Sequence, residues 1–380
     1  MKAITKIIAV AIAALGVATV AGCSGAAPSA KTATNANWNA RTSASVEKNF
    51  TERWLNNREV AEYSISFTEG YNGTYTLNYG DDGVFKTEFG MTYYDWSAQK
   101  DLPDGYAPAG TTKELVYFYI TEMSISGEFK VGENVKAFKD SVSTVCYYRL
   151  AGDNLQPVYS QQVIKNTAPN TLNAPILEAA YIEIDGVYTT YYKADCTKAT
   201  VVHKNNRLTS DDTTTIETGL TSSEGYSVFD NSQLRAAVRA FNISSSATHT
   251  FNVLVPQNGA MQSVHATCTA PVALNKEDEG QMQIIKALDE CSANHPDYLF
   301  FDKSAGEEEK AYRFNAVSMG INTSTNNMTG ASPTFWYSTV ENSEINSTKC
   351  VLLRMSTPIS FGLGTLNYTL KSLSLQPNAN

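Results

Sequence analysis

Tyr63-Ser-Ile-Ser-Phe-Thr68 begins the part of the chain that decides the fold class. Apolar and polar residues alternate along it, and they alternate again in Tyr75-Thr-Leu-Asn-Tyr79. In an extended strand this spacing places the apolar side chains on one face of a sheet. Gly80-Asp-Asp-Gly83 then connects the second run to residues 84–89, and its glycines and aspartates predict a hairpin. The whole stretch favours antiparallel β-structure.

Two dipeptides further along the chain predict more hairpins. Asp185-Gly186 stands between residues 181–184 and 187–192, and Asn258-Gly259 stands between residues 251–255 and 261–268. Both dipeptides suit the positive φ angles of a type I′ turn. The chain also has 21 tyrosines, which occur with Val, Ile, Thr and Phe in short runs that are typical of strands. We therefore predict a mainly β fold, with α+β as the alternative: antiparallel sheets with hairpins and a few short covering helices.

Three segments have the spacing of helices. The first begins at Asp230 or Ser232 and has apolar residues at Leu234, Val238 and Phe241. The second covers residues 277–291, with Asn275 as its cap and with Met282, Ile285 and Leu288 facing inward. The third covers residues 45–55. We expect the helix that begins at Asp230 or Ser232 to lie on a sheet.

A helix followed by strands occurs once from residue 45 and again from about residue 230, which favours two similar modules. The best boundary is the turn-rich stretch of residues 165–175, because two prolines and three asparagines interrupt both periodic patterns there. We predict one β-rich module over residues 45–165. A second, over residues 176–376, would contain two of the helices.

Composition limits the partners. The chain is 42% hydrophobic and 18% charged, so it can build a sizeable core. Its net charge of −9 leaves no basic stripe that could replace the counterions of a nucleic acid, and we predict no nucleic-acid partner. The same acidity argues against a polybasic grip on anionic lipids.

The N-terminus resembles the signal peptide of a bacterial lipoprotein. Lys2 and Lys6 precede a short apolar run that ends in Val20-Ala-Gly-Cys23, the pattern of a lipobox. The resemblance implies that residues 1–22 are removed and that a diacylglyceryl group is attached to Cys23. The alternative is an ordinary secretory signal with a coincidental cysteine.

Lipidation at Cys23 would make the membrane a partner of the mature chain, because two acyl chains hold a protein durably. It would place the protein in the cell envelope, membrane-anchored on the extracytoplasmic side. Residues 23–44 are rich in Ser, Ala, Thr and Asn, and we predict that they form a disordered tether.

The remaining cysteines are Cys146, Cys196, Cys268, Cys291 and Cys350, an odd number that permits two disulfides with one thiol left over, or five thiols. The spacing His265-x-x-Cys268 with Cys291-x-x-x-His295 resembles a zinc site. Strand alternation would point His265 and Cys268 to opposite faces, which weakens that interpretation. The other two interpretations of these cysteines are a Cys268–Cys291 disulfide and unlinked thiols. We predict no metal and no cofactor.

Catalytic motifs find little support. The chain has no Gly-x-Ser-x-Gly elbow, and its four histidines, His203, His249, His265 and His295, have no adjacent Ser/Asp arrangement. We therefore assign no catalytic residue and favour a protein that is not an enzyme. Two carboxylates for glycoside hydrolysis would leave no sequence signature, so a hydrolase stays open as the alternative.

Aromatic residues next to Asp or in pairs are the remaining candidates for binding. Tyr94, Trp96 and Trp336 lie in runs where neighbouring rings point to opposite faces of a strand, so that one ring of each pair can stack on a ligand. The more ordinary interpretation is that tyrosine on a half-buried sheet face is normal strand chemistry.

Together these features predict a lipid-anchored cell-envelope protein that is a non-catalytic binding module for a glycan, an apolar ligand or a protein. In the order of its elements the chain resembles the curved sheets with covering helices of envelope lipoproteins that hold acyl chains. The alternatives are an envelope hydrolase that acts on polysaccharide or peptidoglycan through paired carboxylates, and a scaffold component of a surface complex. A cavity, a cleft with opposed carboxylates or a large apolar patch would distinguish them.

Overall fold

The computed structural model describes residues 53–70, 75–151, 154–165, 185–205, 213–220, 228–237, 247–256, 259–269, 272–295, 315–323, 333–339, 351–359 and 364–378. The predicted signal peptide, Cys23 and the tether lie outside these residues. The helical elements are α3 (Arg53–Asn56), η1 (Trp96–Ala98), α5 (Leu234–Ala237) and α6 (Glu279–Asn294). In the described part of the chain no helix has the length and apolar character needed to cross a membrane.

Strands make up most of the described chain, which confirms the mainly β, antiparallel prediction. They are β1 (Asn57–Glu69), β2 (Tyr75–Tyr79), β3 (Val84–Asp95), β4 (Lys113–Val131), β5 (Asn134–Ala151), β6 (Asn154–Lys165), β7 (Gly186–Tyr192), β8 (Lys198–Asn205), β9 (Thr213–Gly219), β10 (Phe229–Asp230), β11 (Ala247–Val255), β12 (Ala260–Cys268), β13 (Val272–Ala273), β14 (Asn315–Thr323), β15 (Thr334–Thr339), β16 (Leu352–Ile359) and β17 (Gly364–Pro377).

All of these strands belong to one sheet. Strands β3 to β9 follow one another as an antiparallel meander, and β14 to β17 form a second meander. β1 pairs with both β3 and β17, so it joins the two runs. β6 also pairs with β7 across the predicted module boundary. The two predicted modules therefore contribute strands to a single sheet.

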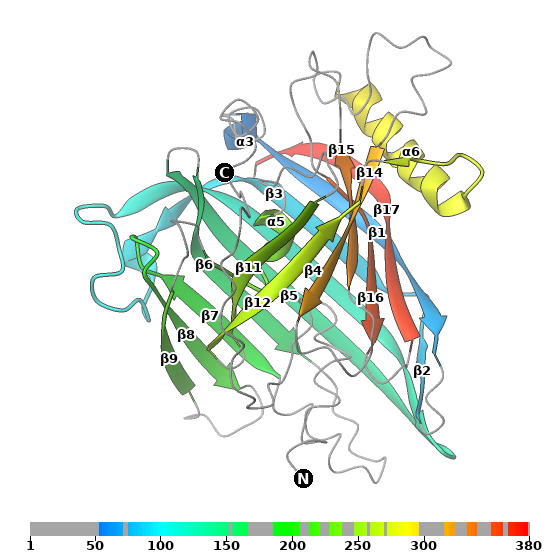
Figure 1. Ribbon diagram of the computed structural model, residues 1–380, viewed down its shortest axis with the longest axis horizontal. Coiled ribbons are helices and arrows are strands. Elements are labelled where there is room, and N and C mark those ends of the chain that lie inside the picture. Colours follow the sequence, from blue (N-terminus) through cyan, green and yellow to red (C-terminus); the bar gives the residue numbers. More distant parts are fainter. Residues whose placement is uncertain are drawn as a thin grey trace.

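The sheet is rolled, and its two ends pack against each other (Figure 1). Figure 1 shows β11 and β12 crossing over β4 to β6 in the view, with α5 beside them. One buried cluster joins Tyr192, Ala199 and Val201 from β7 and β8 to Leu254 from β11. The Thr218 hydroxyl also donates to the Gly259 carbonyl at 2.7 Å. The roll gives the sheet an inner face, on which Phe85, Phe89, Met123, Tyr148 and Tyr368 are buried, and an outer face.

The predicted hairpin at residues 80–83 is wrong. β2 pairs with residues 127–131 of β4, and β3 pairs with residues 113–124 of the same strand, so β2 and β3 run in one direction along it. The Ser126 hydroxyl donates to the Asp82 carboxylate at 2.5 Å, and the Gly80 amide donates to the Ser126 carbonyl. Residues 80–83 therefore form an outward bulge. Glycine and aspartate suit a bulge for the same backbone reasons that suit a turn.

The two dipeptide predictions had different outcomes. β11 and β12 form a hairpin in which Gly259 has a φ of +64°, which confirms the prediction there. Gly186 instead begins β7, pairs with Ile164 and Asn205, and does not have a positive φ. A Cβ at Gly186 would lie 2.6 Å from the Lys204 carbonyl oxygen, so close approach explains this glycine. The predicted strand 181–184 lies outside the described residues.

Helix α6 lies on the outer face, over β1 and β17. It begins with Asp278 as its cap, whose carboxylate accepts from the Gln281 amide, rather than with Asn275 as predicted. Ile285 and Leu288 are buried as predicted, but Met282 is 40% exposed. Gln283 ties the helix to the sheet through hydrogen bonds to the Ser64 hydroxyl and the Leu370 carbonyl. The structure describes part of each of the other two predicted helices. α3 belongs to the helix predicted over residues 45–55, and α5 belongs to the helix predicted to begin at Asp230 or Ser232.

Candidate functional site

Tyr94 and Trp96 lie together, as the sequence suggested, but neither ring is exposed. Each is 3% exposed, and their ring centroids are 4.9 Å apart in an edge-on arrangement. The Trp96 indole N–H donates to the Glu114 carboxylate at 3.1 Å. Tyr93 is the exposed ring of this run. Tyr94 and Trp96 therefore pack inside the protein and present no open face for stacking.

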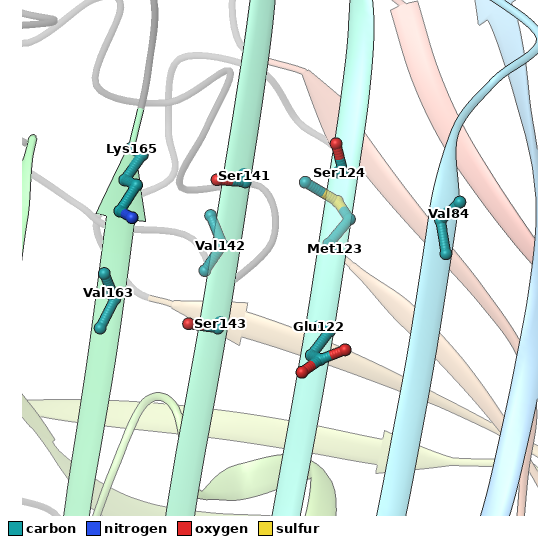
Figure 2. A pocket seen from close by; sticks show the side chains of 9 residues that line it. All are labelled: Val84, Glu122, Met123, Ser124, Ser141, Val142, Ser143, Val163 and Lys165. Atoms are coloured by element: carbon teal, nitrogen blue, oxygen red, sulfur yellow. The ribbon is translucent and has the colours of Figure 1, made fainter.

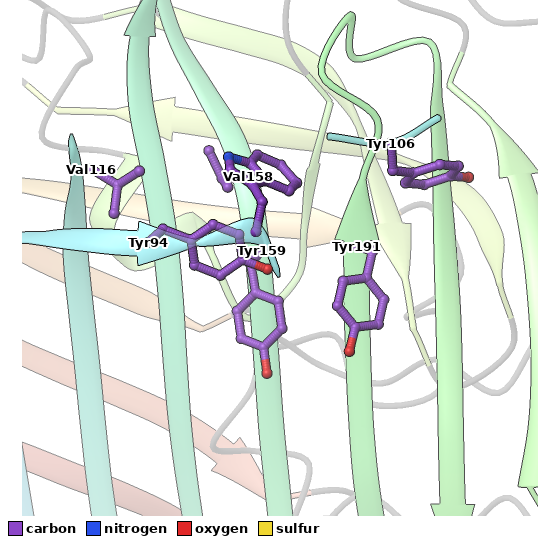
Figure 3. Packing of buried hydrophobic residues seen from close by; sticks show 7 residues of the cluster. Tyr94, Tyr106, Val116, Val158, Tyr159 and Tyr191 are labelled. Carbon is purple, nitrogen blue, oxygen red and sulfur yellow. The ribbon is translucent and has the colours of Figure 1, made fainter. Parts of the chain in front are cut away.

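They belong to an outer aromatic cluster, drawn in Figure 3, whose members are Tyr94, Trp96, Tyr106, Val116, Val158, Tyr159 and Tyr191. Tyr106 comes from the β3–β4 connection, and its hydroxyl hydrogen-bonds the Thr200 hydroxyl at 2.7 Å. Within the part of the chain that the structure describes, the Tyr94 hydroxyl has no hydrogen-bond partner. Burial and the neighbouring tyrosine hydroxyls raise the pKa of Tyr94. The cluster therefore has the closed packing of a core.

Trp336 lies elsewhere in the sheet. It is on β15, and the Arg354 guanidinium lies 5.6 Å from the centre of its ring. The neighbouring residues Phe335 and Tyr337 are buried on the inner face, so Trp336 is on the outer face. β16, β17 and β1 separate β15 from β3. The structure does not bring Trp336 together with Tyr94 and Trp96.

A shallow groove of about 280 Å³ crosses the outer face of β3 to β6 (Figure 2). It is lined by Val84, Glu122, Met123, Ser124, Ser141, Val142, Ser143, Val163 and Lys165. Small serine side chains between larger neighbours leave this hollow. Glu122 and Lys165 supply one charge of each sign. The groove has no aromatic ring and no histidine or cysteine.

The histidine and cysteine pairs of the possible zinc site are described only in part. Among the described residues no three His, Cys, Asp or Glu side chains are grouped as metal ligands. Cys291 is buried, and the Cys268–Cys291 disulfide stays a prediction because the side chain of Cys268 is not described. His295 accepts a hydrogen bond from the Leu375 amide at its Nε2. The side chains of His265 and Cys268 lie outside the described part of the structure, as does Cys350.

The inner face carries a row of polar side chains that sequence analysis did not single out. Its members are successive cross-strand neighbours from β3 to β8: Thr87, Thr121, Thr144, Gln162, Tyr188 and His203. The first five are buried. The His203 ring stacks on Tyr188 with centroids 4.1 Å apart, and burial lowers the pKa of His203. We name this row the inner polar belt.

Residues 228–237, the interior segment, lie against the inner face. Residues 228–236 are all buried. The Tyr148 hydroxyl on β5 donates to the Gln233 carbonyl at 2.8 Å, and the Tyr337 hydroxyl on β15 donates to the Arg235 carbonyl. These contacts come from strands far apart in the sheet. The interior segment is therefore enclosed by the roll.

Asp230 fastens this segment to the wall. Its carboxylate accepts hydrogen bonds from the hydroxyls of Ser160 and Tyr192, and from the backbone amides of Ser232 and Gln233. The Ser232 hydroxyl also donates to it. Full burial raises the pKa of Asp230, and the hydrogen bonds oppose that shift. Both of its carboxylate oxygens are therefore engaged.

Arg235 is a buried cation without a counter-ion among the described residues. It is 7% exposed, and its guanidinium carbon lies 5.6 Å from the centre of the Phe85 ring. Its Nε has no hydrogen-bond acceptor in the described ranges of the chain. Asp230 is on the same segment, but its oxygens are already occupied. A desolvated guanidinium without an acceptor is costly to bury.

Other unpartnered polar atoms lie on the same inner face. They are the hydroxyls of Thr190 and Thr357 and the Nε2 of His203, each buried. Most buried polar atoms in proteins have a partner, often an ordered water, so each of these exceptions needs an explanation. In the sequence these residues look like ordinary strand formers. Thr190 and His203 lie on the neighbouring strands β7 and β8, whereas Thr357 lies on β16.

Comparison with known proteins gives a likeness of shape alone. The chain is similar to a crystal structure of a β-barrel-like protein of the domain of unknown function DUF1849 from Brucella abortus. The TM-score is 0.41 and the identity is 8%, over 84% of this chain and 98% of that chain. No family model matches this chain, and no curated protein matches it either.

Proposed function

We propose that this chain is a lipid-anchored binding protein of the cell envelope that holds a small ligand inside its rolled sheet. The lipobox ending at Cys23 supports the anchor and the extracytoplasmic location. The binding role follows from the interior. It is a function of recognition, and no chemical step is assigned to it.

The observation that carries the proposal is the buried side chain of Arg235, whose Nε has no acceptor within the described residues. If Arg235 served only the fold, the protein would be more stable with an apolar residue of similar size at this position. The inner polar belt and the unpartnered Thr190 hydroxyl add hydrogen-bonding groups on the same face. An interior of this kind suits a ligand that brings its own polar groups.

The outer face favours the other functions less. The outer aromatic cluster is closed by its own loop, so it provides no open row of rings for a glycan. The outer groove is small and lacks an aromatic anchor. We therefore place the binding function inside the roll. The hydrolase and scaffold functions remain alternatives without a specific observation in their favour.

Mass measurement of the protein purified from its own membranes tests both halves of the proposal. Denatured protein is expected to carry a diacylglyceryl group on Cys23, and gently ionised protein is expected to be heavier by the mass of one small molecule. The Cys23→Ala variant is expected in the soluble fraction. An unlipidated Cys23 in membrane-bound protein would contradict the anchor. Equal masses in both states, with no compound in solvent extracts, would contradict the ligand.

A further inference from the structure

We infer that Arg235 recognises the carboxylate of an amphipathic ligand whose apolar part lies on the aromatic inner wall. The inference rests on the proposed function and names the class of ligand. It concerns an ionic contact made entirely inside the rolled sheet.

The guanidinium is placed so that its N–H bonds remain available. Its contact with Phe85 is a cation–π contact, in which a cation lies over the face of a ring. Such a contact does not use the N–H donors, which lie in the plane of the guanidinium. A carboxylate lies in that same plane and can accept two parallel hydrogen bonds from it. The unpartnered Nε of Arg235 is one of these donors.

Three buried acids of the described residues do not fill this role. Asp230 accepts from several donors of the interior segment and its wall. Glu59 and Asp140 are also buried, and each has interactions of its own. In the described structure none of the three makes an ion pair with Arg235. The complementary negative charge is therefore expected from outside the protein.

The wall beside Arg235 is apolar and aromatic. Phe85 packs against Tyr63 and Tyr368, with ring centroids 5.0 and 5.2 Å away. The Tyr368 hydroxyl is directed at the Met123 sulfur, a weak acceptor. These rings are buried under other side chains, which an alkyl or ring body of a ligand would have to displace to gain dispersion and burial on this surface. Beside one cation, it suits a ligand with one acidic head and an apolar body better than it suits a free inorganic anion.

Calorimetric titration of the delipidated mature chain with matched eight-carbon probes tests this inference. Octanoate is expected to bind, 1-octanol to bind more weakly and octylammonium not to bind, while acetate reports on the charge without the body. Arg235→Met is expected to weaken octanoate binding by about tenfold to a hundredfold, because a hydrogen bond to a charged group contributes about 1.5–3 kcal/mol. Arg235→Lys keeps the charge but not the planar fork and is expected to lie between.

Arg354→Met is the matched control. Arg354 also lies 5.6 Å from an aromatic ring, that of Trp336, but on the outer face, and its loss is expected to leave octanoate binding unchanged. Equal binding of octanoate and 1-octanol, with no effect of Arg235→Met, would overturn the carboxylate inference while leaving an interior binding protein. Failure of every probe would overturn the ligand class, and the mass measurement of native protein would then decide the proposed function. Circular dichroism of both Arg235 variants separates loss of binding from loss of fold.

Discussion

The outer aromatic cluster and the interior segment are both buried, yet their polar groups are treated in opposite ways. Around Trp96, Glu114 accepts from the indole and from Arg149, and Arg149 also donates to the Ala194 carbonyl. Around Arg235, the described structure offers a ring face but no acceptor. The first arrangement completes itself with residues of the chain. The second does not.

This difference separates packing from recognition. Aromatic residues drew attention in the sequence because rings often bind ligands, but at Tyr94 and Trp96 they fasten a loop to the sheet. A charge that the fold buries without compensation costs stability and needs another reason to be present. We therefore assign stability to the outer cluster and ligand binding to the interior.

The largest effect is expected from Asp230→Ala. The substitution leaves the Ser160 and Tyr192 hydroxyls and the Gln233 amide without their buried acceptor, and we expect a loss of about 3–5 kcal/mol in the free energy of unfolding. Urea unfolding followed by fluorescence measures it. Asp230→Asn keeps one acceptor oxygen and is expected to lose less. A loss below about 1 kcal/mol for the alanine variant would mean that the segment is not fastened by Asp230.

Trp96→Ala is expected to cost about 3 kcal/mol of unfolding free energy, because it opens a cavity and leaves Glu114 without the indole donor. Octanoate affinity is expected to stay the same in the folded variant. A calorimetric titration beside the unfolding curve provides both values. Lost affinity with retained stability would place ligand recognition in the outer cluster instead.

The raised pKa of Asp230 predicts that the unfolding free energy depends on pH. Its pKa in the folded protein is raised above the ordinary 3.8, so the folded protein binds this proton more tightly than the unfolded chain does. The part of the stability that is linked to protonation of Asp230 is therefore greatest below the unfolded pKa and is lost as the pH rises through the folded pKa. The unfolding free energies of the native chain and of Asp230→Asn are measured from pH 4 upward. Their dependence on pH is expected to differ between the unfolded and the folded pKa of Asp230 and to have the same slope above the folded pKa. Parallel curves throughout would contradict the assignment.

Tyr94→Phe is expected to have the smallest effect. The hydroxyl it removes is buried and has no partner, so the unfolding free energy should stay the same or rise by up to about 1 kcal/mol. Thermal unfolding is sensitive enough to detect this. A clear loss would show that the hydroxyl has a partner in solution, such as a bound water.

The fold class was predictable because strand alternation and turn residues are local properties, as residues 63–68 and Gly259 show. The register was not local. Residues 80–83 have turn chemistry, but whether they reverse the chain or bulge depends on β4, more than thirty residues later. Likewise, Thr87, Thr121 and Thr144 become neighbours only through pairing.

Arg235 was missed for a related reason. In a helix with one apolar stripe, a charged residue between the apolar positions is expected to face the solvent. Arg235 follows Leu234 in such a stripe, so the sequence predicts that it is exposed. In the structure the segment is enclosed on all sides, so the same charge becomes buried. The signal was in the surroundings of the helix and not in its sequence. No pattern along the chain reports enclosure.

The most direct test of the account is the stability of ligand-free Arg235→Met. If the guanidinium serves a ligand, replacing it by an apolar side chain of similar length removes an uncompensated charge, and the unfolding free energy is expected to stay the same or to rise by about 1 kcal/mol or more. If the guanidinium serves the fold, the variant loses about 3 kcal/mol or more, as when a buried ion pair is broken. Urea unfolding of the delipidated variant and native chain side by side gives the answer. A stable variant supports recognition, and a large loss would contradict it.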